Sequence, residues 1–285
     1  MQQFAPLALD ALNYTSVLLL VSIGLIIVFG LMGVINLAHG EFFLIGAYSV
    51  LVAQGFGLPF WIVLPIAFMI TVTVGLCVDA CILRFIYHRP IDTILATWGL
   101  SLAIKQLMII IFGPGAQQVS APITEPAVIF GVTYSSYRIV IMLITGAITV
   151  ATLSLLYLTR FGLAARAAMA NRQMAQCLGI NTRLLDRTTF GLGAGLAGVA
   201  GAVMAPLMSV DPQMGLSFLI PAFLAVLVGG AGSPLGALYG SAVIGTSNTV
   251  IASWWTPVIA QIIVFSLAIV IIRTLPAGIS GFRRS

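Results

Sequence analysis

The stretch TRFGLAARAAMANRQMAQCLGINTRLLDRT, residues 159–188, is a strongly basic loop in a chain that is otherwise apolar. Its charged side chains are five arginines and one acid: Arg160, Arg166, Arg172, Arg183, Arg187 and Asp186. An apolar segment of membrane-spanning length lies on either side of it. Because short basic loops stay on the cytoplasmic side of a membrane, this loop predicts its own location and orients the whole chain.

The composition indicates a membrane protein. Of the 285 residues, 60% are hydrophobic and only 7% are charged, which is more apolar surface than a soluble core of this size can bury. The basic residues gather in loops, where they orient spans, so the net charge of +5 does not indicate nucleic-acid binding. We therefore predict an all-α, polytopic bundle in which residues 1–285 form one transmembrane domain, with a cytoplasmic loop at 159–188.

Apolar segments of about twenty residues predict five membrane-crossing helices, at residues 14–35, 60–83, 91–112, 139–158 and 188–208. Three further segments, 217–228, 235–251 and 258–272, keep the number of crossings after the basic loop even and so place the C-terminus in the cytoplasm. Residues 42–53 reach only about 18 Å as a helix, which suits a re-entrant half-helix or a tilted span. We expect eight or nine segments, and the side of the N-terminus depends on residues 42–53.

Two of these apolar runs are interrupted by glycine and polar residues, at 33–41 and at 229–236. Broken helices at membrane depth are tolerated where the backbone is buried in protein or lines an aqueous cavity, since an unpaired amide in lipid costs several kcal/mol. Two such breaks predict a transport path through the chain. For the glycine-rich second break, a tight turn at the membrane surface is an equal alternative.

Polar residues within the spans are the candidate pathway groups: Asn36, His39, Glu41, Thr97, Trp98 and Ser101. Hydroxyl, indole and amide groups can hydrogen-bond a small polar solute. The alternatives are local: serine and threonine also bond their own helix, Glu41 can satisfy a helix N-terminus, and His39 can cap the same turn. Lys105 and Asp79 lie near span ends, and structural anchoring is the preferred interpretation of both; the long Lys105 side chain can snorkel to the membrane surface.

The sequence contains no set of residues for enzymatic chemistry. Its only lysine, Lys105, follows Ile104 rather than a glycine, so a P-loop for nucleotide hydrolysis is excluded. Gly193, Gly195 and Gly198 match a dinucleotide-binding pattern but lie inside an apolar segment, where small residues let helices approach closely. No catalytic triad or metal-binding pattern occurs, and we expect neither an enzyme nor a bound cofactor or metal.

Within the basic loop, residues 163–178 are rich in alanine and end at Gly179, a typical helix stop. Such a short basic helix on the cytoplasmic face has the shape to dock in a groove of a soluble partner. The alternative is an amphipathic helix resting on anionic membrane lipid.

Three stretches resemble the permease subunits of ATP-binding-cassette importers of the branched-chain amino acid and urea type. These are GLMGVINLAHGEFFLIGAY at 30–48, RFGLAARAAMANRQMAQCLGIN at 160–181 and LVGGAGSPLGALYG at 227–240. The resemblance implies one permease domain in a bacterial inner membrane, with ATP hydrolysed by separate ATPase subunits. It also implies a second related permease, in a heterodimer or homodimer, and an extracytoplasmic solute-binding protein.

The resemblance further implies that the basic loop couples to the ATPase, through Arg166, Ala170, Asn171, Arg172 and Gly179. Residues 87–102 and 171–180 look closer to urea and short-amide permeases, whereas VGGAGSPLG at 228–236 is similar to amino acid permeases. We therefore expect inward transport of urea or a short amide, with a branched-chain amino acid as the alternative substrate. A passive channel is the alternative of another class, although a channel needs no basic coupling helix.

Overall fold

The computed structural model describes residues 4–86, 89–129, 132–230 and 232–282 and is mostly helical, at 79%. The first half contains α1 (Phe4–Met32), α2 (His39–Gly55), α3 (Phe60–Cys81), the short 3-10 helix η1 (Leu83–Phe85), α4 (Pro90–Phe112), β1 (Pro126–Ile129) and β2 (Val132–Ser135). The second half contains α5 (Ser136–Leu158), α6 (Arg160–Ala170), α7 (Arg172–Cys177), α8 (Thr182–Met204), α9 (Met214–Gly229), α10 (Pro234–Trp254), α11 (Pro257–Thr274) and α12 (Gly278–Phe282).

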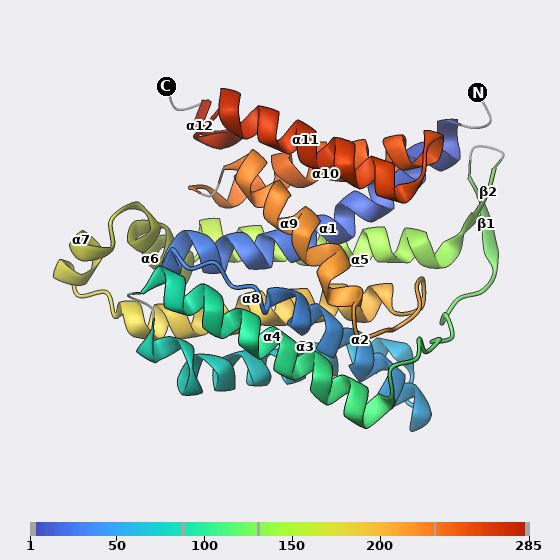
Figure 1. Cartoon of the computed structure of the whole chain (residues 1–285), viewed down its shortest axis with the longest axis horizontal. Coiled ribbons are helices and arrows are strands. Elements are labelled where there is room, and N and C mark those ends of the chain that lie inside the picture. Colours follow the sequence, from blue (N-terminus) through green and yellow to red (C-terminus); the bar gives the residue numbers. More distant parts are fainter. Residues whose placement is uncertain (1–3, 87–88, 130–131, 231, 283–285) are drawn as a thin grey trace.

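The long helices run roughly parallel to the long axis of the molecule (Figure 1). The hairpin β1–β2 and the start of α1 lie at one end, and α6 and α7 lie at the other (Figure 1). Large apolar side chains such as Trp61, Ile110 and Leu143 are exposed on the outer helices. An outward-facing apolar surface of this kind suits lipid, so the helical membrane bundle predicted from composition is confirmed.

Helix α8 occupies the centre of the bundle because its glycines allow other helices to touch its backbone. A Cβ added at Gly193 would lie 2.7 Å from the carbonyl oxygen of Gly24 in α1. Likewise, a Cβ added at Gly46 of α2 would overlap the carbonyl of Gly198. The interpretation of these glycines as helix-packing surfaces is therefore confirmed.

The first predicted break is present, and it separates α1 from the short helix that contains residues 42–53. Helix α1 ends at Met32, Gly33 adopts a left-handed φ of 65°, and α2 begins only at His39. The connecting residues lead from the end of α1 back toward the middle of the bundle (Figure 1). Twelve of the 17 residues of α2 are buried, including its first ten, so the start of the segment is a half-helix set within protein.

Length and composition alone identify five helices able to cross a membrane, or six if the bent pair α9 and α10 counts as one span. By this criterion the expected eight or nine segments are not confirmed. Helix α2 has only 17 residues, and α8 begins with the charged residues Arg183, Asp186 and Arg187. Helices buried inside the bundle do not need the long, uniformly apolar sequence that contact with lipid requires.

The outer loop contains a small antiparallel hairpin that the all-α prediction did not include. Strands β1 and β2 pair Ala127 with Tyr134 and Val128 with Thr133. The Tyr134 hydroxyl donates a 2.9 Å hydrogen bond to Asp10, which also forms an ion pair with Arg138. Burial raises the pKa of Tyr134, which keeps this hydroxyl protonated as a donor. The hairpin is thereby attached to the start of α1.

The basic loop folds as two helices rather than the single helix expected over residues 163–178. Asn171 has extended backbone angles that end α6, and its side-chain oxygen accepts a 2.9 Å hydrogen bond from the Met174 amide to start α7. Asparagine is favoured at helix N-caps rather than in helix interiors, because its side-chain oxygen can accept a hydrogen bond from a nearby backbone amide. The inner faces of the loop helices pack in a small apolar cluster that includes Ala168, Ala175 and Leu185.

Candidate functional site

A buried polar cluster lies where the first break meets α4. Glu41, in the first turn of α2, is fully buried and accepts a 2.7 Å hydrogen bond from the Ser101 hydroxyl. The Lys105 ammonium lies 3.5 Å from the same carboxylate oxygen, Oε1, and the lysine is 7% exposed. Lys105 is therefore not a snorkelling anchor, and the preferred interpretation from the sequence is wrong. The long Lys105 side chain points into the protein, where the Glu41 carboxylate compensates its charge.

The polar face of α4 is built from residues four apart: Thr93, Thr97, Ser101 and Lys105, all buried. The Thr97 hydroxyl accepts a 3.2 Å hydrogen bond from the Leu37 amide inside the break. Residues at this spacing share one helix face, so the stripe was visible in the sequence as a repeat of i, i+4. Sequence reasoning identified Thr97 and Ser101 but missed Thr93 and the inward position of Lys105.

Trp98 lies away from this cluster. It is 56% exposed on the outer face of α4, one residue out of phase with the polar stripe. Adjacent residues of a helix point about 100° apart, which separates the indole from Thr97. The structure therefore does not bring Trp98 together with the other predicted pathway residues.

Asn36 and His39 are also buried at the first break, and the His39 ring faces α1 rather than α4. The Asn36 side-chain oxygen accepts a 3.0 Å hydrogen bond from the Ala38 amide, and His39 Nε2 lies 3.3 Å from the Val21 carbonyl. Asn36 Nδ2, His39 Nδ1 and Glu41 Oε2 are buried without a hydrogen-bond partner in the described part of the chain. Unpaired buried polar atoms cost free energy, so each of these atoms can hydrogen-bond a solute or water.

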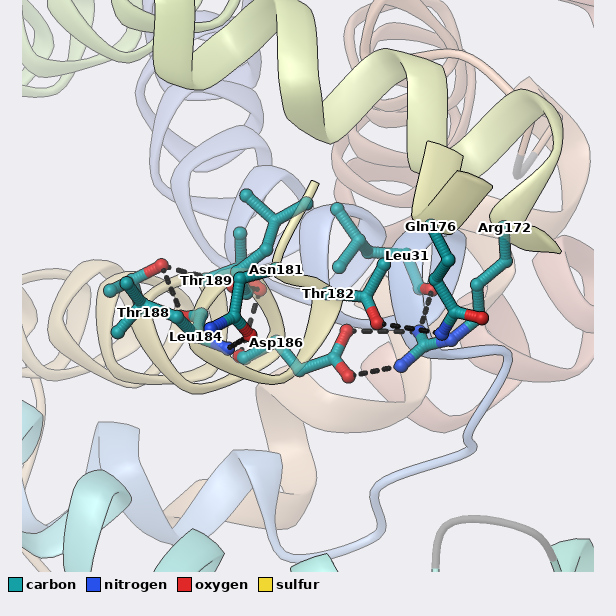
Figure 2. A network of polar contacts seen from close by, with 10 residues as sticks. Leu31, Arg172, Gln176, Asn181, Thr182, Leu184, Asp186, Thr188 and Thr189 are labelled. Carbon is teal, nitrogen blue, oxygen red and sulfur yellow. Dashed lines mark hydrogen bonds and ion pairs between the residues drawn. The ribbon is translucent and has the colours of Figure 1, made fainter. Parts of the chain in front are cut away.

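At the α6 end, Arg172 joins three separate elements (Figure 2). Its guanidinium forms a two-pronged contact with the Asp186 carboxylate of α8, with Nη1 to Oδ1 at 3.0 Å. Nη1 also donates a 3.3 Å hydrogen bond to the Leu31 carbonyl, near the end of α1. Arginine is suited to bidentate carboxylate binding, and a cation at a helix C-terminus is favourable.

The other predicted coupling residues divide into two groups. The Arg166 guanidinium stacks over the Tyr157 ring at 4.8 Å, so it is turned toward the bundle. Ala170, Asn171 and Gly179 are exposed on the outer surface of the loop. Gly179 has a φ of 83°, a left-handed conformation that favours glycine after a helix end.

Two large apolar side chains, Met174 and Leu178, are exposed beside these residues, at 58% and 74%. Sequence reasoning stressed the arginines and missed this apolar pair, whose i, i+4 spacing was the available signal. Exposed apolar side chains on a polar loop are typical of a contact surface.

Asp79 borders a cavity of about 620 Å³ at this end, together with Arg84, Arg183 and Arg187. It is 5% exposed, and its Oδ1 has no hydrogen-bond partner among the described residues. The carboxylate thus faces a charged cavity, and its expected anchoring role is not supported by a direct contact.

Over residues 7–272, the sequence matches the family described as branched-chain amino acid transport system, permease component. The chain belongs to this permease family. Discontinuous helices with polar groups inside an apolar bundle are common at the solute sites of transporters. No solved structure matches the chain.

Curated relatives agree with this membership of the permease family. The chain is 27% identical to the high-affinity branched-chain amino acid transport system permease protein LivH of Salmonella typhimurium, over 92% of this chain and 90% of the relative. It is 30% identical to the probable branched-chain amino acid transport permease protein LivH of Methanocaldococcus jannaschii, over 95% and 90%. It is also 28% identical to LivM of Escherichia coli, over 79% of this chain and 59% of the relative. The expected preference for urea or short amides finds no support here, whereas the alternative of a branched-chain amino acid permease does.

Proposed function

We propose that this chain is the permease subunit of an ATP-driven importer that moves branched-chain amino acids into a bacterial cell across the inner membrane. The observation that carries the proposal is the buried cluster at the first break, where Glu41, Asn36 and His39 each retain an unpartnered polar atom. Membership in the permease family supplies the substrate class. A solute that passes the break would exchange water for these groups, as at the discontinuous helices of other transporters.

Partner subunits supply the energy, since the sequence holds no P-loop. We propose that ATPase subunits bind the outer surface of α6 and α7, through Met174 and Leu178 with the neighbouring Asn171 and Gly179. The arginine-rich loop then lies in the cytoplasm, as does the C-terminus, and the hairpin β1–β2 lies outside. A solute-binding protein delivers substrate at the hairpin end.

Movement of the loop reaches the break through Arg172. This side chain holds α8 through Asp186 and α1 through the Leu31 carbonyl, two residues before Gly33. A displacement of α7 would therefore pull on the end of α1, next to the flexible glycine of the break. We infer that this contact transmits the ATPase movement to the substrate path.

A second, related permease completes the path. Two different proteins of Escherichia coli, LivH and LivM, are both named permease proteins of a branched-chain amino acid transport system, and both are similar to this chain. We propose a pair of related permeases, as a heterodimer or a homodimer.

Reconstitution tests the proposal. The complex with its partner permease, ATPases and binding protein is placed in liposomes, and uptake of labelled leucine, isoleucine, valine and urea is measured with and without ATP. We expect ATP-dependent uptake of the three amino acids and no uptake of urea. Urea uptake in their place would restore the amide substrate, and equal uptake without ATP would identify a passive channel.

A further inference from the structure

We infer that Glu41 and Lys105 are the recognition pair for the substrate's own charges, with the α-ammonium group received by Glu41 and the α-carboxylate by Lys105. This inference rests on the proposed function and names how an amino acid, rather than a neutral amide, is selected. Three observations support it: the long distance within the pair, the burial of both side chains, and the unpartnered polar atoms at the break.

Glu41 and Lys105 form an ion pair, but the distance between their charged atoms is long. The Nζ to Oε1 distance is 3.5 Å, whereas a charge-assisted hydrogen bond between an ammonium and a carboxylate is about 2.8 Å long. The shorter contact to Oε1, at 2.7 Å, comes from Ser101, and Oε2 has no partner. Glu41 therefore has a free acceptor oxygen for an incoming ammonium group.

Burial explains why two opposite charges stand here together. A single buried charge is strongly unfavourable, but an ion pair compensates itself while the site is empty. A zwitterion carries one positive and one negative group, so inserting it between Lys105 and Glu41 replaces one ion pair with two and leaves the net charge at zero. Urea, which is neutral, offers neither charge and would leave the original pair in place.

Neighbouring groups extend the site. Asn36 Nδ2 is a buried donor without a partner, as a bound carboxylate requires, and it lies in the break beside Leu37, whose amide bonds Thr97 of α4. Glu41 is fully buried, so a substrate must gain access to it before binding. Substrate access then requires α4 to separate from the start of α2, across the hydrogen bonds of Thr97 and Ser101.

A purely structural ion pair makes a different prediction, and the double variant Glu41→Gln/Lys105→Met separates the two. Replacing both members of a buried pair by neutral residues of similar size is often tolerated, whereas removing one leaves an uncompensated charge. We expect the double variant to fold, to associate with its partners and to retain ATP hydrolysis stimulated by loaded binding protein. Leucine uptake should fall at least tenfold, because the charged groups of the substrate no longer meet opposite charges in the path. The same binding protein and ATPases serve both complexes, so the loss can be assigned to the pair.

Thr145→Val in α5 is the matched control, since the buried Thr145 hydroxyl lies outside the site and donates only to the backbone carbonyls of Ile141 and Met142 in its own helix. It should transport leucine at the unmodified rate. Glu41→Asp, which keeps both charges but shortens the carboxylate arm, serves as a second variant and should lower leucine uptake several-fold with ATP hydrolysis unchanged. Unmodified uptake by the double variant, or by Glu41→Asp if the double variant does not fold, would overturn the inference. Failure of the unmodified complex to import any branched-chain amino acid would instead refute the proposed function.

Discussion

Arg172 connects the basic loop to both α8 and α1. Its removal would leave the Asp186 carboxylate, only 3% exposed, without its cation and the Leu31 carbonyl without its donor. An unpaired buried charge costs several kcal/mol. Because the arginine side chain itself is 35% exposed, solvent screens part of this loss.

We predict that Arg172→Ala lowers the free energy of unfolding by about 2 kcal/mol and also weakens the stimulation of ATP hydrolysis by loaded binding protein. Thermal unfolding of the purified chain and ATPase assays of the complex measure the two effects. Arg183→Ala is the control, because the exposed Arg183 side chain makes no ion pair in the described structure. Equal behaviour of the two variants would remove Arg172 from the coupling mechanism.

The close packing of α2 against α8 depends on Gly46. A methyl group at this position would overlap the Gly198 carbonyl, so α2 and α8 would have to move apart. We expect Gly46→Ala to lower stability by about 2 kcal/mol or more, as overpacking of a tight core does. Gly99→Ala on the exposed face of α4 meets nothing within 4 Å and should be neutral or slightly stabilising. Thermal unfolding of both variants in detergent distinguishes local strain from a general effect of alanine.

Among the elements, α7 and the residue that follows it present two exposed apolar side chains, Met174 and Leu178. Met174 and Leu178 are 58% and 74% exposed, so a partner that covers them gains the burial of this apolar surface. We predict that Met174→Glu/Leu178→Glu abolishes co-purification of the ATPase subunits while leaving the thermal stability of the chain unchanged. Val128→Glu, also at an exposed apolar residue but in strand β1, is the control and should retain the ATPase. Retention by both variants would place the ATPase contact elsewhere.

At the scale of the whole molecule, the two ends of the bundle should lie on opposite sides of the membrane. Cys177 is exposed in α7, and Val128 is exposed in β1. In a variant with Cys77 and Cys81 replaced by serine, a membrane-impermeant thiol reagent should label Cys177 only in inside-out vesicles. The substitution Val128→Cys should add labelling from outside the cell. Labelling of both sites from one side would reject the proposed orientation.

The sequence by itself determined the class of the molecule and the positions of its exceptional segments. Apolar runs predict the long outer helices, and the glycine and polar residues at 33–41 predict the break, because both depend on the local cost of placing backbone and side chains in lipid. Local chemistry also indicates that Glu41 and Ser101 are unusual, and it predicts a cytoplasmic position for the basic loop.

Only the tertiary structure decided which polar residues meet. Lys105 turns inward because α4 packs against the start of α2, and Trp98 faces out for the same reason. The loop divides at Asn171 because its helices must pack on α8, and Arg172 reaches Leu31 across 141 positions of sequence. Periodicity describes one helix at a time, whereas the partner of a buried charge is set by how the helices pack against each other in space.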